Sequence, residues 1–385
     1  MTLKISDRGR VPPFLVMEVL RAASEREIRG GSVLHMEIGQ PSLGLPAGAA
    51  AAVAHEVAGG DPMGYTVAQG IPALRRRIAR HAHAVYGVEV PVERVFCTMG
   101  SSAAFLIAFL TAFAPGDRVG LAAPGYPAYR HILKAVGVEP VLLPVGAETR
   151  FQPTIEMIEG LGLDGLIVAS PSNPTGSMLP PEALQALAEY CHGAGIRLIS
   201  DEIYHGITYG MTAATAAAFS PSAVVINSFS KYYCMTGWRL GWLVLPEDMM
   251  RPVECLAQNL FISPPTISQI AAVRTFDHLE ELDAIVRGYA RNRDLLVHGL
   301  AGLGIDKVAP PDGAFYVYAD VSHLGPDSRE LCRRMLDETG VAVAPGWDFD
   351  PADGGRFVRF SYSGSTATVI TAIERLRDWL PKRNA

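Results

Sequence analysis

Short runs of apolar residues alternate with segments of helical apolar spacing through the middle of the chain. Residues 166–170 form one such run, which a turn cluster at residues 171–176 ends. From Pro180 onward, apolar side chains recur at helical spacing as far as Cys191, and residues 196–200 form the next apolar run. Strand, helix and strand in this order predict a βαβ unit with parallel strands and a right-handed crossover.

Four further apolar runs indicate more strands of the same kind. They cover residues 118–123, 138–143, 223–227 and 240–245. Runs that are apolar throughout are typical of strands buried on both faces, as in a mostly parallel sheet covered by helices. We therefore predict an α/β fold, with this sheet in a large domain at residues 46–275.

The pattern changes beyond residue 275. Residues 276–300 are charged and amphipathic, which predicts a long helix leading away from the sheet. A strand at 313–319, a helix at 328–339 and a strand at 357–362 are expected to follow. This order predicts a smaller α+β domain, built from residues 276–385 and completed by residues 1–45.

Composition narrows the class of protein. The 385 residues carry a net charge of -6 without a clustered Lys/Arg stripe, which argues against nucleic acid as a partner. The five cysteines are widely spaced and form no CxxC pair, so neither a zinc ribbon nor a disulfide framework is expected. His81 and His83 would point apart on a helix, and no metal site is predicted.

The location expected from the sequence is the cytoplasm. Glu18 and Arg21 interrupt the first apolar segment, which argues against a signal peptide. Uninterrupted apolar runs stay below the about 18 residues that a membrane span needs. We therefore predict a soluble cytoplasmic protein that does not interact with membranes.

Chemically different polar residues follow three successive apolar runs. Asn173 follows the first run, Asp201 and Tyr204 follow the second, and Lys231 follows the third. Ligands of open parallel sheets bind beyond the carboxyl ends of the strands. An amide, a carboxylate, a phenol and an amine at one edge therefore predict a ligand-binding site there.

The segments around these positions resemble the class I/II aminotransferases of pyridoxal 5′-phosphate (PLP) fold type I, the aspartate aminotransferase-like enzymes. The motifs are Asn173-Pro-Thr-Gly, Asp201-Glu-Ile-Tyr204 and Ser228-Phe-Ser-Lys231, with Arg239 after seven intervening residues. Residues 38–41, 65–75, 124–127 and 358–362 follow the family's order as well. The resemblance thus extends over nearly the whole chain. It implies a sheet of the seven-stranded type, PLP as cofactor and a homodimer with a shared active site.

The resemblance gives three residues catalytic roles. Lys231 is expected to bind PLP as a Schiff base and then to move the substrate Cα proton, which requires a pKa below the usual ~10.4. Asp201 is expected to face the pyridine nitrogen, and Tyr204 and Asn173 to donate hydrogen bonds to the phenolic oxygen. In isolation, Asp201 would be read as a helix N-cap and Asn173, before Pro174, as part of a turn.

The resemblance also predicts the rest of the cofactor site. Tyr126 is expected to stack on the cofactor ring, and Tyr65 to reach the phosphate from the neighbouring subunit. A helix N-terminus is an anion site in its own right, although ordinary helix capping explains Gly100-Ser-Ser nearly as well. The residues expected to bind the phosphate within one subunit are Gly100, Ser101, Ser102, Ser228 and Arg239.

Substrate binding is expected at the C-terminal strand. Arg359 would bind the α-carboxylate bidentately, with the backbone N–H of Gly39 and the side chain of Asn173 beside it, whereas Arg356 is interpreted as a surface residue. The resemblance suggests where acidic substrates would find a cation, and this chain has Asn259 and Ser101 there. Together with the apolar Phe14 and Val16, these departures favour neutral or aromatic amino donors.

The function predicted from these residues is a PLP-dependent aminotransferase. It would move the amino group of an L-amino acid to a 2-oxo acid by a ping-pong mechanism through pyridoxamine phosphate. A carbon–sulfur β-lyase on the same scaffold is one alternative, since it shares the lysine, aspartate and arginine. A non-catalytic PLP-binding protein is another.

Overall fold

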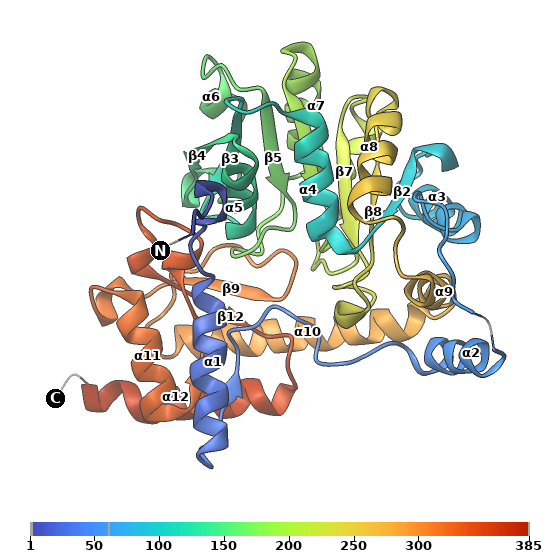
Figure 1. The fold of residues 1–385 in the computed structure, drawn as a ribbon. Coiled ribbons are helices and arrows are strands. Elements are labelled where there is room, and N and C mark those ends of the chain that lie inside the picture. The colour runs from blue at the N-terminus through green and yellow to red at the C-terminus, as the bar shows by residue number, and fades with distance from the viewer. Residues whose placement is uncertain (1–2, 61, 384–385) are drawn as a thin grey trace.

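A seven-stranded sheet forms the centre of the fold in the computed structural model, which describes residues 3–60 and 62–383 (Figure 1). The strand order is β2-β8-β7-β6-β5-β3-β4. The central strands pair in parallel, and β8 runs antiparallel to both of its neighbours. The strands are β2 (Val95–Thr98), β3 (Arg118–Ala123), β4 (Glu139–Pro144), β5 (Gly165–Ala169), β6 (Arg197–Asp201), β7 (Val224–Ser228) and β8 (Gly241–Val244).

The predicted α/β class and the mostly parallel, seven-stranded sheet are confirmed. The apolar run at residues 240–245 does form a strand, but β8 is antiparallel and not part of the parallel set. The short strand β2 was not predicted. Its four residues are buried, and a four-residue run gives little periodicity to detect.

Helices cover both faces of this sheet. Successive residues of a strand, such as Leu166 and Ile167, belong to two different buried apolar clusters, because side chains alternate across a strand. One face packs against α4 and α5, and the other against α3 and α7. The helices around the sheet are α2 (Ala47–Ala58), α3 (Pro72–Tyr86), α4 (Gly100–Ala112), α5 (Pro127–Val136), α6 (Ile155–Ile158), α7 (Pro181–Gly193), α8 (Glu247–Leu260) and α9 (Thr266–Thr275).

A smaller α+β assembly lies below the sheet in Figure 1, and the long helix α10 (Leu279–Ala301) leads into it. Its antiparallel sheet has the order β11-β12-β9, and the parallel pair β1-β10 joins the N-terminal segment to it. The remaining elements are α1 (Leu15–Ile28), β1 (Leu34–His35), β9 (Tyr316–Asp320), α11 (Ser328–Thr339), β10 (Val341–Ala342), β11 (Ala344–Pro345), β12 (Phe357–Ser361) and α12 (Thr366–Arg383).

This arrangement supports the division that the sequence predicts, which we retain as a proposal. The large domain is residues 46–275, and the small domain is residues 1–45 together with 276–385. The pairing of β1 with β10 is the physical reason for joining the two ends of the chain in one unit. No helix among the described residues combines the length and the apolar character that a bilayer span requires.

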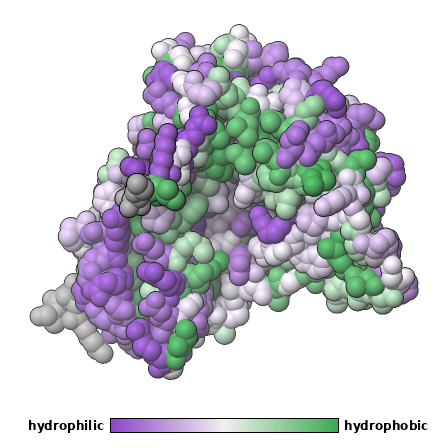
Figure 2. Space-filling view, viewed as in Figure 1, coloured by the Kyte–Doolittle hydropathy of each residue, from purple (hydrophilic) through white to green (hydrophobic). Residues whose placement is uncertain are grey.

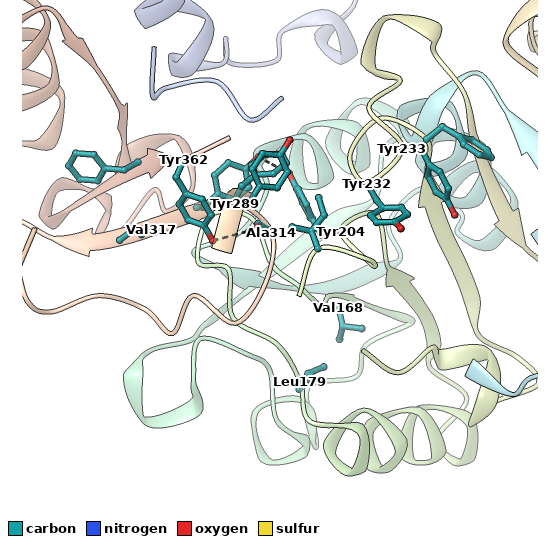
Figure 3. Close-up of a cluster of buried hydrophobic side chains, with 14 of the residues drawn as sticks. Val168, Leu179, Tyr204, Tyr232, Tyr233, Tyr289, Ala314, Val317 and Tyr362 are labelled. Carbon is teal, nitrogen blue, oxygen red and sulfur yellow. Dashed lines mark hydrogen bonds between the residues drawn. The ribbon is translucent and has the colours of Figure 1, made fainter. Parts of the chain in front are cut away.

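The core is continuous across the two domains. The largest buried cluster contains Val168 of β5, Leu179 and Tyr204 from the large domain and Ala314 and Tyr362 from the small domain (Figure 3). The Tyr362 hydroxyl donates to the carbonyl of Ala314 at 3.4 Å. The carboxyl ends of β5 and β6 are thus held close to the small sheet, and this is where the candidate site lies.

Candidate active site

A cavity of about 460 Å³ lies at the carboxyl ends of the parallel strands, between the two domains. Figure 2 shows the surface hollowed in this region, with apolar side chains along its upper rim. The cavity brings together most of the residues that the sequence predicts for the site: Gly39, Ser101, Ser102, Tyr126, Asn173, Asp201, Tyr204, Lys231, Arg239 and Arg359.

Lys231 lies shortly after β7, and its amine reaches across to the small domain. Its Nζ donates a hydrogen bond to the carbonyl oxygen of Gly39 at 2.5 Å. Burial lowers the pKa of Lys231 to about 8, and the nearby charges of Arg359 and Arg239 act in the same direction. A larger fraction of the amine is therefore neutral near pH 7 than for an exposed lysine, and a neutral amine can attack a carbonyl group.

Asp201 is the last residue of β6 and is 3% exposed. Its Oδ1 accepts from the backbone N–H of Ile203 at 3.1 Å, and its Oδ2 accepts from the hydroxyl of Tyr129. Burial raises the pKa of Asp201 to about 6, which these hydrogen bonds oppose. A buried carboxylate of this kind favours a cationic N–H partner in the cavity.

Tyr129 was not predicted as a site residue. It lies on α5, one helical turn after Tyr126, and the two ring centroids are 5.3 Å apart. The spacing of three residues places both rings on one face of the helix, which is the signal that could have identified it.

Arg359 of β12 is 3% exposed and lies between two aromatic rings. Its Cζ is 4.4 Å from the ring centroid of Tyr316 and 4.7 Å from that of Phe349. Its Nη1 donates to Oδ1 of Asn173 at 2.8 Å, and its Nη2 donates to the carbonyl of Glu37. Its buried Nε has no hydrogen-bond partner among the described residues. Buried donors are normally paired, so Nε is available for an oxygen of a bound ligand.

The side chain of Asn173 is oriented by this contact. Because Oδ1 accepts from Arg359, the amide group Nδ2 remains free to donate a hydrogen bond into the cavity.

Tyr204 is 2% exposed, and its hydroxyl lies 2.6 Å from that of Tyr316. Tyr316 lines the cavity as well and was not predicted as a site residue.

The N-terminus of α4 lies at one end of the cavity, next to Arg239. Gly100 has a φ of +76°, and a Cβ at this position would lie 2.5 Å from Nη2 of Arg239. Glycine therefore allows the guanidinium to approach the helix N-terminus, where free N–H groups also favour an anion. Ser101 and Ser102 line the cavity at this end.

Three predicted residues do not line the cavity. Gly100 contacts Arg239, as described. Ser228 is buried, and its Oγ accepts from the backbone N–H of Ser230 at 3.1 Å and donates to the carbonyl of Leu240 at 3.3 Å. It is Ser230 that lines the cavity. Tyr65 is 83% exposed on the surface of the chain.

The outer wall of the cavity is apolar and comes from the N-terminal segment. Phe14, Val16, Met17 and Leu20 line it, which includes both residues predicted for an apolar lid. The segment is held by Asp348, whose two carboxylate oxygens accept from the backbone N–H groups of residues 15 and 16 at 3.1 Å each. Asp348 thus caps the N-terminus of α1 from more than 330 residues away in the sequence.

Two other predictions concern residues outside the cavity. Arg356 is half-exposed and pairs with Asp320 at 2.7 Å and Asp353 at 2.9 Å, which confirms its interpretation as a surface residue. Asn259 does not line the cavity, and its Nδ2 donates to the carbonyl of Cys255 at 2.8 Å. The described residues also include no group of three or more His, Cys, Asp or Glu that could hold a metal ion.

Comparisons with known proteins agree with this geometry. Residues 32–376 match the family model "Aminotransferase class I and II". The chain is 50% identical to the valine–pyruvate aminotransferase of Mycobacterium tuberculosis, with all of both chains covered. It is similar to the crystal structure of an aminotransferase from M. tuberculosis, with a TM-score of 0.97, 49% identity and 99% and 100% of the two chains covered.

A third comparison is with the aspartate aminotransferase of Thermus thermophilus in a structure with maleate. The TM-score is 0.91 at 31% identity, with 97% of this chain and 99% of that chain covered. None of the relatives named here is a lyase. The chain belongs to the class I and II aminotransferases and transfers the amino group of an amino acid to a 2-oxo acid.

Proposed function

We propose that the cavity binds PLP and that the preferred amino donors are neutral amino acids with apolar side chains. The observation that carries the cofactor assignment is the placement of Lys231 and Asp201. A buried amine with a lowered pKa and a buried carboxylate lie in one cavity, next to a helix N-terminus with a guanidinium beside it. These groups fit the aldehyde, the pyridine nitrogen and the phosphate of PLP, respectively.

The remaining cofactor contacts follow from the same geometry. Lys231 would hold the cofactor as a Schiff base and Asp201 would face its ring nitrogen. The free Nδ2 of Asn173 and the hydroxyl of Tyr204 would donate to its phenolic oxygen. Ser101, Ser102, Ser230 and Arg239 line the end proposed for the phosphate, Ser228 supports that loop, and Tyr126 lines the wall proposed for stacking. When bound, PLP supplies an electron sink for the electrons of the broken Cα–H bond.

The protein's own groups bind the substrate and move its proton. Arg359 is proposed to bind the α-carboxylate, because its Nε is unpaired and its ring contacts fix the plane of the guanidinium. Gly39 and Asn173 line the cavity as well, and the side chain of Asn173 contacts Arg359 directly. The Lys231 amine, with its lowered pKa, is suited to accept the Cα proton and return it.

The proposal for the donor rests on the apolar wall formed by Phe14, Val16, Met17 and Leu20. The side chain of an acidic donor would be desolvated against this wall, and Ser101 offers no charge to compensate. The M. tuberculosis relative named for valine and pyruvate supports the same class of donor.

We also propose a homodimer in which Tyr65 reaches the phosphate site of the partner. The tyrosine lies on the surface, 83% exposed, close in sequence to the exposed Val67. Tyrosine and other aromatic side chains are enriched in subunit interfaces relative to the rest of a protein surface. Light scattering is expected to give twice the mass of one chain, and a Tyr65→Phe variant is expected to bind PLP more weakly. A monomeric protein with full PLP affinity would contradict this proposal.

An absorbance experiment tests the cofactor and the donor together. Purified protein reconstituted with PLP is expected to show a visible cofactor band that valine, leucine or phenylalanine bleaches in the absence of a 2-oxo acid. Product analysis should find a 2-oxo acid that retains the donor's side chain. The donor proposal is wrong if aspartate has the highest kcat/KM in a panel, and the cofactor proposal is wrong if no band forms.

A further inference from the structure

Tyr316 lies at the point where the small domain meets the cofactor side of the cavity. It is the first residue of β9 and is 1% exposed. Its hydroxyl is 2.6 Å from that of Tyr204, which Figure 3 shows beside Ala314 where the two domains meet. The mechanism described above gives Tyr316 no role.

The absence of a side chain at Gly39 leaves the space that the Tyr316 hydroxyl occupies. A Cβ on Gly39 would lie 1.8 Å from the Tyr316 hydroxyl oxygen, so any other residue at position 39 would displace it. The carbonyl of Gly39 accepts from Lys231. The hydroxyl of Tyr316 therefore lies between the Gly39 loop, which contacts Lys231, and Tyr204, the tyrosine proposed to contact the cofactor.

The two hydroxyls have one more hydrogen than their shared hydrogen bond uses. Each phenol can donate once, and neither has a second hydrogen-bond partner among the side chains that the structure describes. If Tyr204 donates to a ligand in the cavity, its oxygen must accept from Tyr316. If Tyr204 donates to Tyr316 instead, it has no hydrogen for the ligand.

The charge of Arg359 decides between these two directions. Its Cζ lies 4.4 Å from the ring centroid of Tyr316, which places a buried cation over that ring. A cation there stabilises negative charge on the phenol and makes its hydroxyl a better donor. The amine of Lys231 lies over the ring of Tyr204 at a longer distance, 5.7 Å from its centroid, so Tyr316 is favoured as the donor.

We propose that Tyr316 is a positioning residue that donates its hydroxyl hydrogen to the oxygen of Tyr204 and so keeps the hydrogen of Tyr204 directed at the phenolic oxygen of the bound cofactor. The inference rests on the proposed binding of PLP. Because an accepted hydrogen bond polarises the hydroxyl that receives it, Tyr204 also becomes the stronger donor. The phenolic oxygen is then stabilised in its negatively charged form.

The test is a pH titration of the visible cofactor band in a Tyr316→Phe variant. The phenylalanine ring remains beneath Arg359, so the change removes the hydroxyl alone. When Tyr204 donates less strongly, the phenolic oxygen of the cofactor keeps more negative charge. This charge stabilises the protonated form of the lysine–cofactor linkage. The pKa of the band is expected to rise by about one unit, the equivalent of one hydrogen bond of ordinary strength.

Tyr318→Phe is the matched control. Tyr318 lies two residues further along β9 and is fully buried, and its hydroxyl has no hydrogen-bond partner among the described residues. Its removal is expected to leave the pKa of the band unchanged. A Tyr204→Phe variant is expected to raise the pKa more than Tyr316→Phe, and the double variant no more than Tyr204→Phe alone, since Tyr316 acts through Tyr204.

Two results would overturn this inference without affecting the proposed binding of PLP. One is that the wild-type band titrates normally and the Tyr316→Phe variant has the same pKa, while circular dichroism shows that the variant is folded. The other is an equal shift when Tyr316 is changed in the Tyr204→Phe background. A wild-type protein that forms no band would instead overturn the cofactor assignment, and this inference with it.

Discussion

The two walls of the cavity are built in different ways. On the large-domain wall, Asp201 ends β6, and Asn173 and Lys231 follow its neighbours β5 and β7. On the small-domain wall, the groups come from distant parts of the chain. Gly39 follows β1, and Arg359 lies on the antiparallel strand β12.

This difference separates two tasks. The large-domain wall is anchored in a sheet covered by helices on both faces, which suits groups that must hold a cofactor rigidly. The small-domain wall is the one proposed to bind the substrate, its α-carboxylate through Arg359 and its variable side chain through the apolar residues of α1. Changes in the first wall are therefore expected to abolish the chemistry, and changes in the second to alter substrate binding.

The largest effect is expected from Lys231→Ala on the large-domain wall. The variant loses both the covalent anchor and the group proposed to move the Cα proton, so kcat is expected to fall by about 10⁴-fold or more. Stopped-flow kinetics with valine would measure the loss, and the visible cofactor band should disappear. A variant that keeps the band would contradict the assignment of the anchor.

A smaller effect is expected from Arg359→Ala on the opposite wall. The loss of a charged, bidentate contact should lower kcat/KM for the donor by about 100- to 1,000-fold, mostly through KM. Steady-state kinetics over a range of donor concentrations would separate the two constants. The cofactor band itself should still form.

Arg356→Ala is the control for that variant. Arg356 lies three residues away, is half-exposed and pairs with the carboxylates of Asp320 and Asp353 in the small domain. Its removal should leave KM within about twofold, because surface ion pairs contribute little. If both variants raise KM equally, Arg359 is not the carboxylate site.

The same contrast explains what the sequence could predict. Asp201 and Lys231 follow apolar strands, and the carboxyl ends of parallel strands meet at one edge, so periodicity alone placed them together. Their roles came from the family resemblance. The antiparallel direction of β8 escaped prediction, because an apolar run shows that a strand is buried and not which way it points.

The residues that were missed lie mainly on the small-domain wall. Tyr316 and Tyr318 stand in one apolar run, and nothing in that run distinguishes a hydroxyl that meets Tyr204 from one buried without a partner. The capping of α1 by Asp348 joins residues more than 330 positions apart. Contacts of this kind depend on how the two domains pack, which local spacing does not encode.

Asp348→Ala is expected to weaken the attachment of α1 to the small-domain wall while leaving the catalytic step largely unchanged. Two backbone N–H groups at the start of α1 would lose their acceptors, at a cost of about 1 kcal/mol for a lost helix cap. The apolar wall would be held less firmly, and KM for valine should rise by about 5- to 10-fold while kcat changes less. Asp117→Ala, which removes a turn contact of the large domain, should leave KM unchanged.

The smallest effect is expected at His35, where a substitution should change the free energy of unfolding in a way that depends on pH. This residue ends β1, just before the loop that carries Gly39, and its Nδ1 lies 2.7 Å from Oε1 of the buried Glu37. The hydrogen bond to Glu37 raises the pKa of His35 to about 9, from an ordinary 6.5. Because the folded-state pKa is the higher one, the protonated ring stabilises the fold fully below about pH 6.5, and the contribution is lost as the pH rises through about 9.

His35→Gln should therefore lower the free energy of unfolding by about 1 kcal/mol at pH 6, a value reduced for the ring's partial exposure to solvent. The difference from the wild type should vanish above about pH 9.5, because the wild-type ring is then neutral as well. Urea unfolding at a series of pH values would measure this. His83→Gln is the control, since His83 and its partner Glu89 are both largely exposed. A deficit in His35→Gln that persists unchanged at high pH would mean that the residue supports the Gly39 loop through packing and not through its charge.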